Sequence, residues 1–448
     1  MNHNGQAMVI GGGLAGCEAA WQLLCRGCRV TLWEMKPERY SPAHSSPGLA
    51  ELVCSNSLRS GDPASAAGLL KEEMRRLGSL LMAAADRTSL PAGKSLAVDR
   101  QLFSSHIQEH LLAWGERFQL VRREIAELPT AAPTIVATGP LTSDALTAAI
   151  QRLTGRECLY FYDAVAPIVA ADSVDPTRSF WASRYDPSSE EGAGDYLNCP
   201  LSEETYHAFR EEILAAEKFP LRSFESPRYF EGCLPVEILA QRGPRTLLFG
   251  PMKPVGLTDP RTGRQPWAVV QLRRENASGT LLNMVGFQTK LTRPEQERIF
   301  RMIPGLSQAE FARYGSIHRN TFLRSPGLIN NRLQLISYPH LLFAGQLTGV
   351  EGYIESAAMG LYAGLSLARM LTGVELSPPP DTTALGSLIR HITTAGKKEF
   401  QPMNINHGLL RPLSLRIKKS ERGREYARRS LDDLSAWMTQ QGIEVLPG

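Results

Sequence analysis

MVIGGGLAGCEAAWQLLCRGCRVTLWEM, at residues 8–35, is the stretch that decides the fold. A short apolar strand leads into a glycine-rich turn, a helix follows, and a second strand spans residues 30–35, which predicts a βαβ unit. Its GxGxxG pattern and the glutamate that closes the second strand are typical of dinucleotide-binding sites. Glycines let the backbone approach a pyrophosphate, and the helix N-terminus attracts its charge. The predicted cofactor-binding residues here are Gly11, Gly12, Gly13, Leu14, Ala15, Gly16 and Glu34.

Two later elements favour FAD over NAD as the dinucleotide. A strand that ends in Ala137-Thr138-Gly139, and a strand, glycine and helix between Phe343 and Ala357, occur where two-dinucleotide-fold flavoproteins bring the chain back to the flavin. A helix that begins near Tyr353 would direct its N-terminal dipole at the pyrimidine side of the flavin ring. The further predicted cofactor-binding residues are Thr138, Gly139, Gly345, Gln346, Gly352, Tyr353 and Glu355.

The chain divides into three predicted regions. The fold class is α/β, with a discontinuous Rossmann-like FAD-binding domain at residues 1–160 and 325–376. One amphipathic surface helix is expected at 66–85, where leucines alternate with charges at helical spacing. Residues 161–324 change to short strands, aromatics and turns, including the segments around 228–239 and 246–257, which predicts an inserted β-rich α+β domain. Residues 381–448 read as a basic, mainly helical segment.

Composition places the chain among ordinary globular proteins. Hydrophobic residues make up 43% and charged residues 21% of the 448 residues. No unbroken apolar stretch is long enough for a membrane span, and no export signal is seen. Seven scattered cysteines favour reduced thiols in the cytoplasm over a disulfide framework. Cys25 and Cys28 form a CxxC without a second pair, so no metal site is expected.

Long motifs identify the chain as similar to the folate- and FAD-dependent tRNA (uracil-5-)-methyltransferase family. They include AELVCSNSLRS at 50–60, FEGCLPVE at 230–237, LLFGPMKPVGLTDPRTG at 247–263 and AGQLTGVEGYIESAA at 344–358, and the likeness covers nearly the whole chain. The resemblance implies that methylenetetrahydrofolate supplies one carbon, that FAD carries it to C5 of a uridine, and that NADH or NADPH is the reductant. The implied product is 5-methyluridine, most often at the T-loop position 54 of tRNA.

The resemblance also singles out Cys54 and Cys233. Uracil C5 becomes nucleophilic when a thiolate adds at C6, and a second group must then remove the C5 proton. We assign Cys233 as the nucleophile and Cys54 as the base or as a guard of the flavin-bound carbon, with the direction of this assignment left open. Cys199, in YLNCP, is interpreted as a structural thiol.

Other residues are assigned to folate and RNA. His318 and Tyr353 are candidates for folate contact beside the flavin. Basic residues are expected to meet RNA phosphates in the inserted domain and in a C-terminal run where only Glu421 and Glu425 are acidic. The RNA candidates are Lys253, Arg261, Arg264, Arg273, Arg274, Lys418, Lys419, Arg422, Arg424, Arg428 and Arg429.

Three alternatives remain open at this point. The segment HGLLRPL at 407–413 departs from what relatives tend to carry, which keeps ribosomal RNA open as a target. A flavin oxidoreductase acting on a small molecule would need neither the two thiols nor a basic tail. A non-catalytic RNA-binding flavoprotein would tolerate loss of both cysteines. The oligomeric state does not follow from the sequence.

Overall fold

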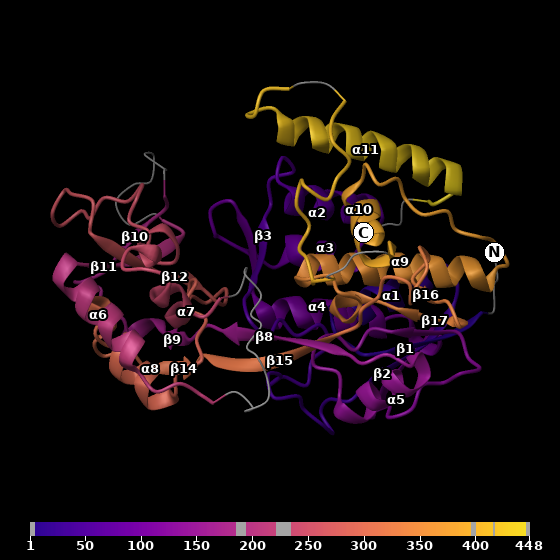
Figure 1. Cartoon of the computed structure of the whole chain (residues 1–448), viewed down its shortest axis with the longest axis horizontal. Coiled ribbons are helices and arrows are strands. Elements are labelled where there is room, and N and C mark those ends of the chain that lie inside the picture. The colour runs from indigo at the N-terminus through magenta and orange to yellow at the C-terminus, as the bar shows by residue number, and fades with distance from the viewer. Residues whose placement is uncertain (1–4, 185–193, 221–233, 396–399, 415–416, 445–448) are drawn as a thin grey trace.

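The computed structural model describes residues 5–184, 194–220, 234–395, 400–414 and 417–444. Figure 1 shows a larger lobe built on a parallel sheet and a smaller lobe built on a second sheet. Two long strands run between the lobes, and one helix lies along the outside of the larger lobe. None of the described helices combines the length and the hydrophobicity that a bilayer crossing requires.

The larger lobe is organised around a six-stranded sheet of order β16-β17-β7-β1-β2-β6. All neighbouring strands are parallel except β16 and β17. The strands are β1 (Gln6–Ile10), β2 (Arg29–Glu34), β6 (Phe118–Arg122), β7 (Thr134–Val136), β16 (Gln334–Leu335) and β17 (Tyr338–Phe343). The helices of this lobe include α1 (Leu14–Cys25), α4 (Arg100–Leu112), α5 (Asp144–Thr154) and α9 (Tyr353–Leu371). A small sheet of β3 (Ser57–Ser60), β5 (Ser95–Val98) and β4 (Ser89–Leu90) lies beside them.

The register of the parallel strands brings their carboxyl ends to one edge. Ile10 at the end of β1 pairs with Trp33 of β2 and with Val136 of β7, and Val136 pairs with Phe343 of β17. The segments that follow these strands must therefore meet, as they do in other open α/β sheets that bind ligands at this edge.

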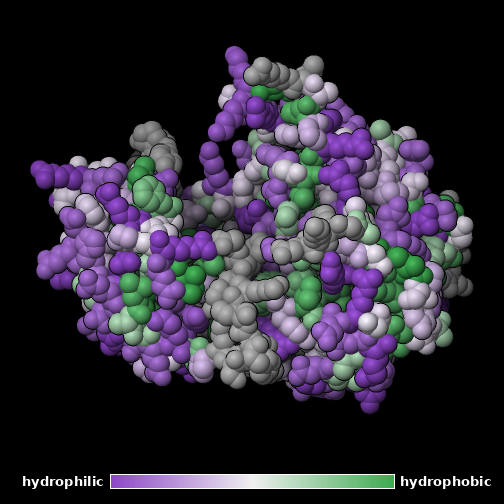
Figure 2. Space-filling model, in the orientation of Figure 1, coloured by the Kyte–Doolittle hydropathy of each residue, from purple (hydrophilic) through white to green (hydrophobic). Residues whose placement is uncertain are grey.

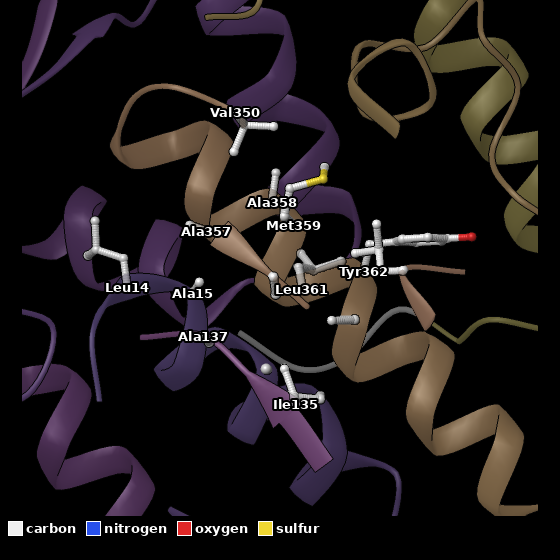
Figure 3. Close-up of a cluster of buried hydrophobic side chains, with 14 of the residues drawn as sticks. Leu14, Ala15, Ile135, Ala137, Val350, Ala357, Ala358, Met359, Leu361 and Tyr362 are labelled. Carbon is white, nitrogen blue, oxygen red and sulfur yellow. The ribbon is translucent and has the colours of Figure 1, made fainter. Parts of the chain in front are cut away.

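Small residues let α1 and α9 cross at close range above the sheet. A Cβ added at Gly360 would lie 2.1 Å from the Ala15 carbonyl oxygen, and one added at Gly364 would lie 2.7 Å from that of Ala19. Figure 3 shows the side chains around this crossing, with Ala15 of α1 and Ala357 of α9 drawn from the two helices. The contact fixes where α9 begins, and hence where its N-terminus points.

The smaller lobe is inserted into the larger one through a two-stranded ribbon. The ribbon strands β8 (Leu159–Val165) and β15 (Ser316–Phe322) pair antiparallel along their whole length. The lobe itself has an antiparallel sheet of β10 (Phe180–Ala182), β11 (Tyr196–Leu201), β12 (Ala268–Arg274), β13 (Leu281–Met284), β9 (Ile168–Ala170) and β14 (Phe311–Arg313). Its helices are α6 (Glu203–Ala215), α7 (Val236–Gln241) and α8 (Arg293–Phe300). Buried aromatics such as Phe209, Phe287 and Phe300 form its separate core.

Two sequence expectations are corrected by the fold. The single helix expected at 66–85 is two helices, α2 (Ala66–Arg76) and α3 (Leu80–Arg87), because Gly78 adopts a φ of +69° between them. In the inserted lobe, the described part of the segment around 228–239 forms α7 from Val236 onward, and residues 228–233 lie outside the described residues. The segment around 246–257, which was expected to supply a strand, forms a short 3-10 turn at Thr246–Phe249 and no strand. Pro235 stands at the N-terminus of α7, where a proline suits a helix start.

The C-terminal part packs against the larger lobe. It contains α10 (Ala384–Thr393) and the surface helix α11 (Arg422–Gln441). The carboxylate of Glu73 on α2 accepts hydrogen bonds from the backbone N–H groups of Ala384 (2.7 Å) and Leu385 (2.8 Å) and from the Ser430 hydroxyl of α11 (2.5 Å). One buried side chain therefore ties three helices together.

Candidate active site

The glycine-rich turn between β1 and α1 has a separate steric reason for each glycine. Gly11 has a φ of +104°, and a Cβ there would lie 2.6 Å from the Ala137 carbonyl oxygen. A Cβ at Gly16 would lie 1.8 Å from the Gly11 carbonyl oxygen, so only glycine allows helix and strand to pack. A Cβ at Gly13 meets nothing within 4 Å. Gly13 thus leaves open the space that a phosphate would occupy.

Glu34 fixes the turn from the second strand. Its Oε2 accepts the Gly12 backbone N–H at 2.7 Å, and its Oε1 accepts the Lys36 backbone N–H at 2.9 Å. Each carboxylate oxygen has further acceptor capacity, so Glu34 still offers a ribose hydroxyl its expected partner. Gly12 and Gly16 serve the turn itself, because neither of them lines the cavity described next.

A cavity of about 480 Å³ opens at the carboxyl edge of the parallel sheet. It unites elements that are far apart in the chain: the turn between β1 and α1, the segment after β7, the loop of residues 52–56 (the Cys54 loop) and the start of α9. The predicted cofactor-binding residues that line it are Gly11, Gly13, Leu14, Ala15, Glu34, Thr138, Gly139, Gly345, Gln346, Gly352 and Tyr353. Cys54 and His318 line the same cavity.

Glu355 does not line the cavity, and its assignment as a cofactor-binding residue stays a prediction. Its fully buried carboxylate pairs with the Arg59 guanidinium at 2.8 Å and accepts the Ile405 backbone N–H at 3.0 Å. Arg59 does line the cavity. The carboxylate one turn into α9 therefore positions β3 and the C-terminal segment.

Both helices that point at the cavity begin without a side-chain cap. The N-cap residues are Gly13 for α1 and Gly352 for α9, and neither provides a capping oxygen. Helix N-termini without such a cap attract anions or electron-rich groups. A dinucleotide that lies along the cavity could thus place its pyrophosphate at α1 and its flavin pyrimidine edge at α9. The residues present therefore fit FAD.

Cys54, in the Cys54 loop, contacts Tyr353, the first residue of α9. The Tyr353 hydroxyl oxygen accepts the backbone N–H groups of Cys54 (2.7 Å) and Ser55 (3.3 Å), and it lies 3.0 Å from the Cys54 Sγ. Because both oxygen lone pairs accept N–H groups, the hydroxyl donates its hydrogen to Sγ. Burial of the thiol, with the Asp163 carboxylate nearby, raises the pKa of Cys54 to about 12. Cys54 is thus a thiol at neutral pH in this arrangement.

Arginine side chains hold the Cys54 loop from two sides. Arg273 of β12 donates from Nη2 to the Asn56 Oδ1 (2.7 Å) and to the Ser55 Oγ (3.0 Å). Arg100 donates to the carbonyl oxygens of Leu52 and Val53 and pairs with Glu275 of the inserted lobe. Arg273 is 5% exposed, which corrects its assignment as an RNA contact. Arg273 of the inserted lobe and Arg100 of α4 therefore hold the Cys54 loop together.

Polar side chains gather where the ribbon reaches the cavity. His318 and Asn320 of β15 line it, and both are almost fully buried, with no hydrogen-bond partner for the His318 Nδ1 or the Asn320 Oδ1. Burial lowers the pKa of His318, so its ring is neutral near pH 7. Glu351 accepts the Gln346 amide at 2.5 Å, and burial, with Asp163 nearby, raises its pKa. Asn320, Glu351 and Asp163 were not assigned a role from the sequence.

The proposed RNA-facing residues of the inserted lobe differ in their surroundings. Arg261 forms a bidentate salt bridge with Asp259, in which Nε donates to Oδ1 at 2.9 Å and Nη2 donates to Oδ2 at 2.7 Å. The Arg274 guanidinium lies 4.4 Å from the centre of the Trp181 ring. Arg264 is exposed and Lys253 half-buried. Figure 2 shows a face that is mainly hydrophilic over both lobes, with hydrophobic residues in small separate areas.

The C-terminal basic residues lie on and just before α11. Lys418, Lys419, Arg422 and Arg424 are exposed. Arg428 pairs with Glu425 and Asp432, and Arg429 donates to the carbonyl oxygens of Arg411 and Pro412. The exposed cations therefore concentrate at the beginning of α11.

Two further cysteines, Cys199 and Cys233, were assigned roles from the sequence. Cys199 is fully buried in the core of the inserted lobe, and burial raises its pKa to about 12, in keeping with a structural thiol. Cys233 lies outside the described residues. Its predicted role as nucleophile therefore stays a prediction.

Comparisons with known proteins point in one direction. The family profile described as "Glucose inhibited division protein A" matches residues 6–375. A relative from Syntrophus aciditrophicus (strain SB), named "Methylenetetrahydrofolate--tRNA-(uracil-5-)-methyltransferase TrmFO", is 57% identical over 444 residues, which cover 99% of this chain and all of the relative. A relative of the same name from Geobacter sulfurreducens is 58% identical over 97% of this chain and 99% of its own.

Solved structures support the fold. The "Structure of Aquifex aeolicus GidA in the form II crystal" has a TM-score of 0.71 and 16% identity, and the match covers 99% of this chain and 74% of that chain. The form I crystal of the same protein gives a TM-score of 0.69. The predicted fold class, a Rossmann-like flavoprotein fold with an inserted domain, is confirmed.

Proposed function

Because the chain belongs to the glucose-inhibited division protein A family, and its close relatives are named TrmFO, we propose that it methylates a uridine of tRNA at C5 with methylenetetrahydrofolate as carbon donor. The structural observation that carries this proposal is the meeting of two uncapped helix N-termini and Cys54 on one cavity. FAD, when bound there, supplies one-carbon and electron transfer. The small-molecule oxidoreductase alternative is not favoured by these relatives.

The residues of the chain have separate tasks in this proposal. Gly13 and the start of α1 hold the pyrophosphate, Glu34 holds a ribose, and the start of α9 stabilises negative charge on the ring. Neutral His318 faces the same cavity, where it offers a flat, uncharged ring for the folate. Tyr353 donates a hydrogen bond that stabilises a thiolate at Cys54 when the proton leaves.

The two cysteines keep the roles proposed from the sequence. A thiolate of Cys233 adds at uracil C6 and is eliminated again when the C5–C6 double bond re-forms in the product; this role rests on the FEGC motif alone. Cys54 then accepts the C5 proton or guards the one-carbon unit. A guard can act as the thiol that burial favours, whereas a base requires the thiolate that Tyr353 stabilises.

A reductant is required by electron balance. The methylene carbon of the folate donor is two electrons more oxidised than the methyl group of the product. We propose NADH or NADPH as the source of these two electrons, binding transiently at the flavin face. We also propose the cytoplasm as the site of action, because tRNA and reduced thiols are found together there.

The test is nucleoside mass spectrometry on RNA from cells with and without the gene. We expect 5-methyluridine to disappear from tRNA, to return with the parent gene and not to return with the Cys54→Ala variant. Ribosomal RNA is analysed separately, and no change is expected in it. Unchanged 5-methyluridine in tRNA of the deletion strain would contradict the proposal.

A further inference from the structure

One segment of the inserted lobe is strongly basic. Residues 241–274 contain seven basic residues and a single acid, Asp259, a net charge of +6, whereas the whole chain has a net charge of +4. Arg273 is buried and Arg261 is paired with Asp259. Besides the paired Arg261, the exposed arginines of the segment are Arg242, Arg245 and Arg264. A surface of this charge is complementary to a polyanion.

An aromatic side chain stands in the same segment with almost all of its surface in solvent. Phe249 is 83% exposed, the highest value among the large hydrophobic residues that the structure describes. The next is Ile336 at 58%. A single exposed hydrophobic side chain is common on protein surfaces, so the ring points to a partner only in combination with the basic residues of the same segment.

The loop that presents Phe249 is anchored on both sides. Leu247 and Met252 are fully buried in the core of the inserted lobe. The Met252 backbone N–H donates to the Leu247 carbonyl oxygen at 2.9 Å, and that of Gly250 donates to the same oxygen at 3.1 Å. The ring is therefore held outward by a defined turn.

The Phe249 loop lies within reach of the cavity. A Cβ added at Gly286 would lie 2.8 Å from the Pro251 Cβ, so the turn at Gly286 is in contact with this loop. Two residues further on, Gln288 lines the cavity. Two residues of chain span at most about 7 Å, so the backbone of Phe249 lies within about 20 Å of that of Gln288. A short run of nucleotides spans such a distance.

We propose that Phe249 is a stacking platform for an unpaired base of the RNA substrate, next to the uridine that enters the cavity. Arg242, Arg245 and Arg264 contact the phosphates on either side of that base. Aromatic side chains among basic residues bind single-stranded RNA in this way, since every base has a flat face. This inference rests on the proposed function, because it names the surface that the tRNA loop uses.

The test measures RNA binding apart from catalysis. A fluorescein-labelled T-arm stem–loop is titrated with the full-length holoprotein, and fluorescence anisotropy gives the dissociation constant. For Phe249→Ala we expect weaker binding by about 5- to 150-fold, the range that base–aromatic stacking contributes. Phe249→Trp should bind within about threefold of the parent, because the indole also stacks, whereas Phe249→Leu should resemble the alanine variant.

One control variant and one charge variant define the surface. Ile336→Ala removes another exposed apolar side chain and should leave RNA affinity unchanged. Arg264→Ala should lower the slope of log affinity against log salt concentration by about one, as loss of one phosphate contact does. Ile336→Ala should also reduce its flavin with the nicotinamide cofactor at the parental rate.

Three results would overturn the inference. The first is Phe249→Ala binding the stem–loop within twofold of the parent while the parent binds and methylates it, which leaves the proposed function intact. The second is Phe249→Leu binding as tightly as Phe249→Trp. The third is a change in sedimentation mass for Phe249→Ala, which would assign the ring to a contact between two copies of the chain. A parent protein that neither binds nor methylates the RNA would remove the proposed function as well.

Discussion

The larger lobe and the inserted lobe contribute to the same cavity with different parts of the chain. The larger lobe contributes the backbone of the turn at Gly11 to Gly16 and of the glycine-started helix α9, together with side chains such as Glu34 and Tyr353. The inserted lobe contributes side chains, with Arg273 on the Cys54 loop and Gln288 at the cavity wall. A backbone site has strict steric demands and a readable sequence pattern. A side-chain site depends on contacts between residues that are far apart in the chain.

The largest effect is expected where the backbone site is tightest. Gly16→Ala places a Cβ 1.8 Å from the Gly11 carbonyl oxygen, so α1 must move away from β1 and the phosphate cradle must open. We expect purified protein with less than about a hundredth of the parental flavin affinity, measured from flavin absorbance and titration. Gly61→Ala is the control, because its Cβ would have 3.9 Å of clearance. Parental flavin content in Gly16→Ala would refute the steric argument.

The second effect concerns the thiol at the boundary between the lobes. With a pKa of about 12, Cys54 should react with iodoacetamide at pH 8 about a thousand times more slowly than a thiol of ordinary pKa near 9. The rate should rise tenfold for each pH unit up to about pH 11. Peptide mass spectrometry separates Cys54 from the other cysteines. Tyr353→Phe should slow the reaction further, since the hydrogen bond to Sγ favours the thiolate.

The third effect concerns the stability that the buried Glu73 carboxylate gives to the larger lobe where α2 meets α10 and α11. Burial raises the pKa of Glu73 from 4.5 to about 7. An acid with a raised folded-state pKa binds more protons in the folded protein, so its contribution to stability is full below pH 4.5 and is lost as the pH rises through 7. The free energy of unfolding of Glu73→Gln relative to the parent should thus shift by about 3 kcal/mol in favour of the variant between pH 4 and pH 8. Denaturant titrations at both pH values measure this difference, and an equal difference at both would contradict it.

The smallest effect is expected for the contact between the lobes. Arg273→Lys keeps the charge but cannot donate to Asn56 and Ser55 together. We expect a loss of about 1.5–3 kcal/mol, seen as a 10- to 100-fold lower kcat with little change in the KM for tRNA. Arg274→Lys on the same strand is the control, because that side chain lies against Trp181. Equal losses in both variants would mean that β12 acts only through its fold.

The sequence predicted the backbone part of the site better than its side-chain contacts. The GxGxxG spacing and Glu34 predicted a cradle whose residues the structure brings to one edge of the sheet. The ion pair between Glu355 and Arg59 was not foreseen, because the two residues lie far apart in the chain. The arginines that hold the Cys54 loop were missed or misread, since their partners lie about 50 to 220 positions away. Charge alone does not distinguish a buried arginine from one on the surface.

The ribbon of β8 and β15 has a consequence for how such a chain could arise. Leu159 and Phe322 pair at its base, so the points where the inserted lobe begins and ends are adjacent on neighbouring strands. A lobe joined this way is a cassette: its length and content can change without stretching the parallel sheet, because the gap to be closed stays that of one strand pair. Ancestral enzymes could therefore have exchanged this cassette for another, acquiring new substrates while the nucleotide cradle stayed as it was.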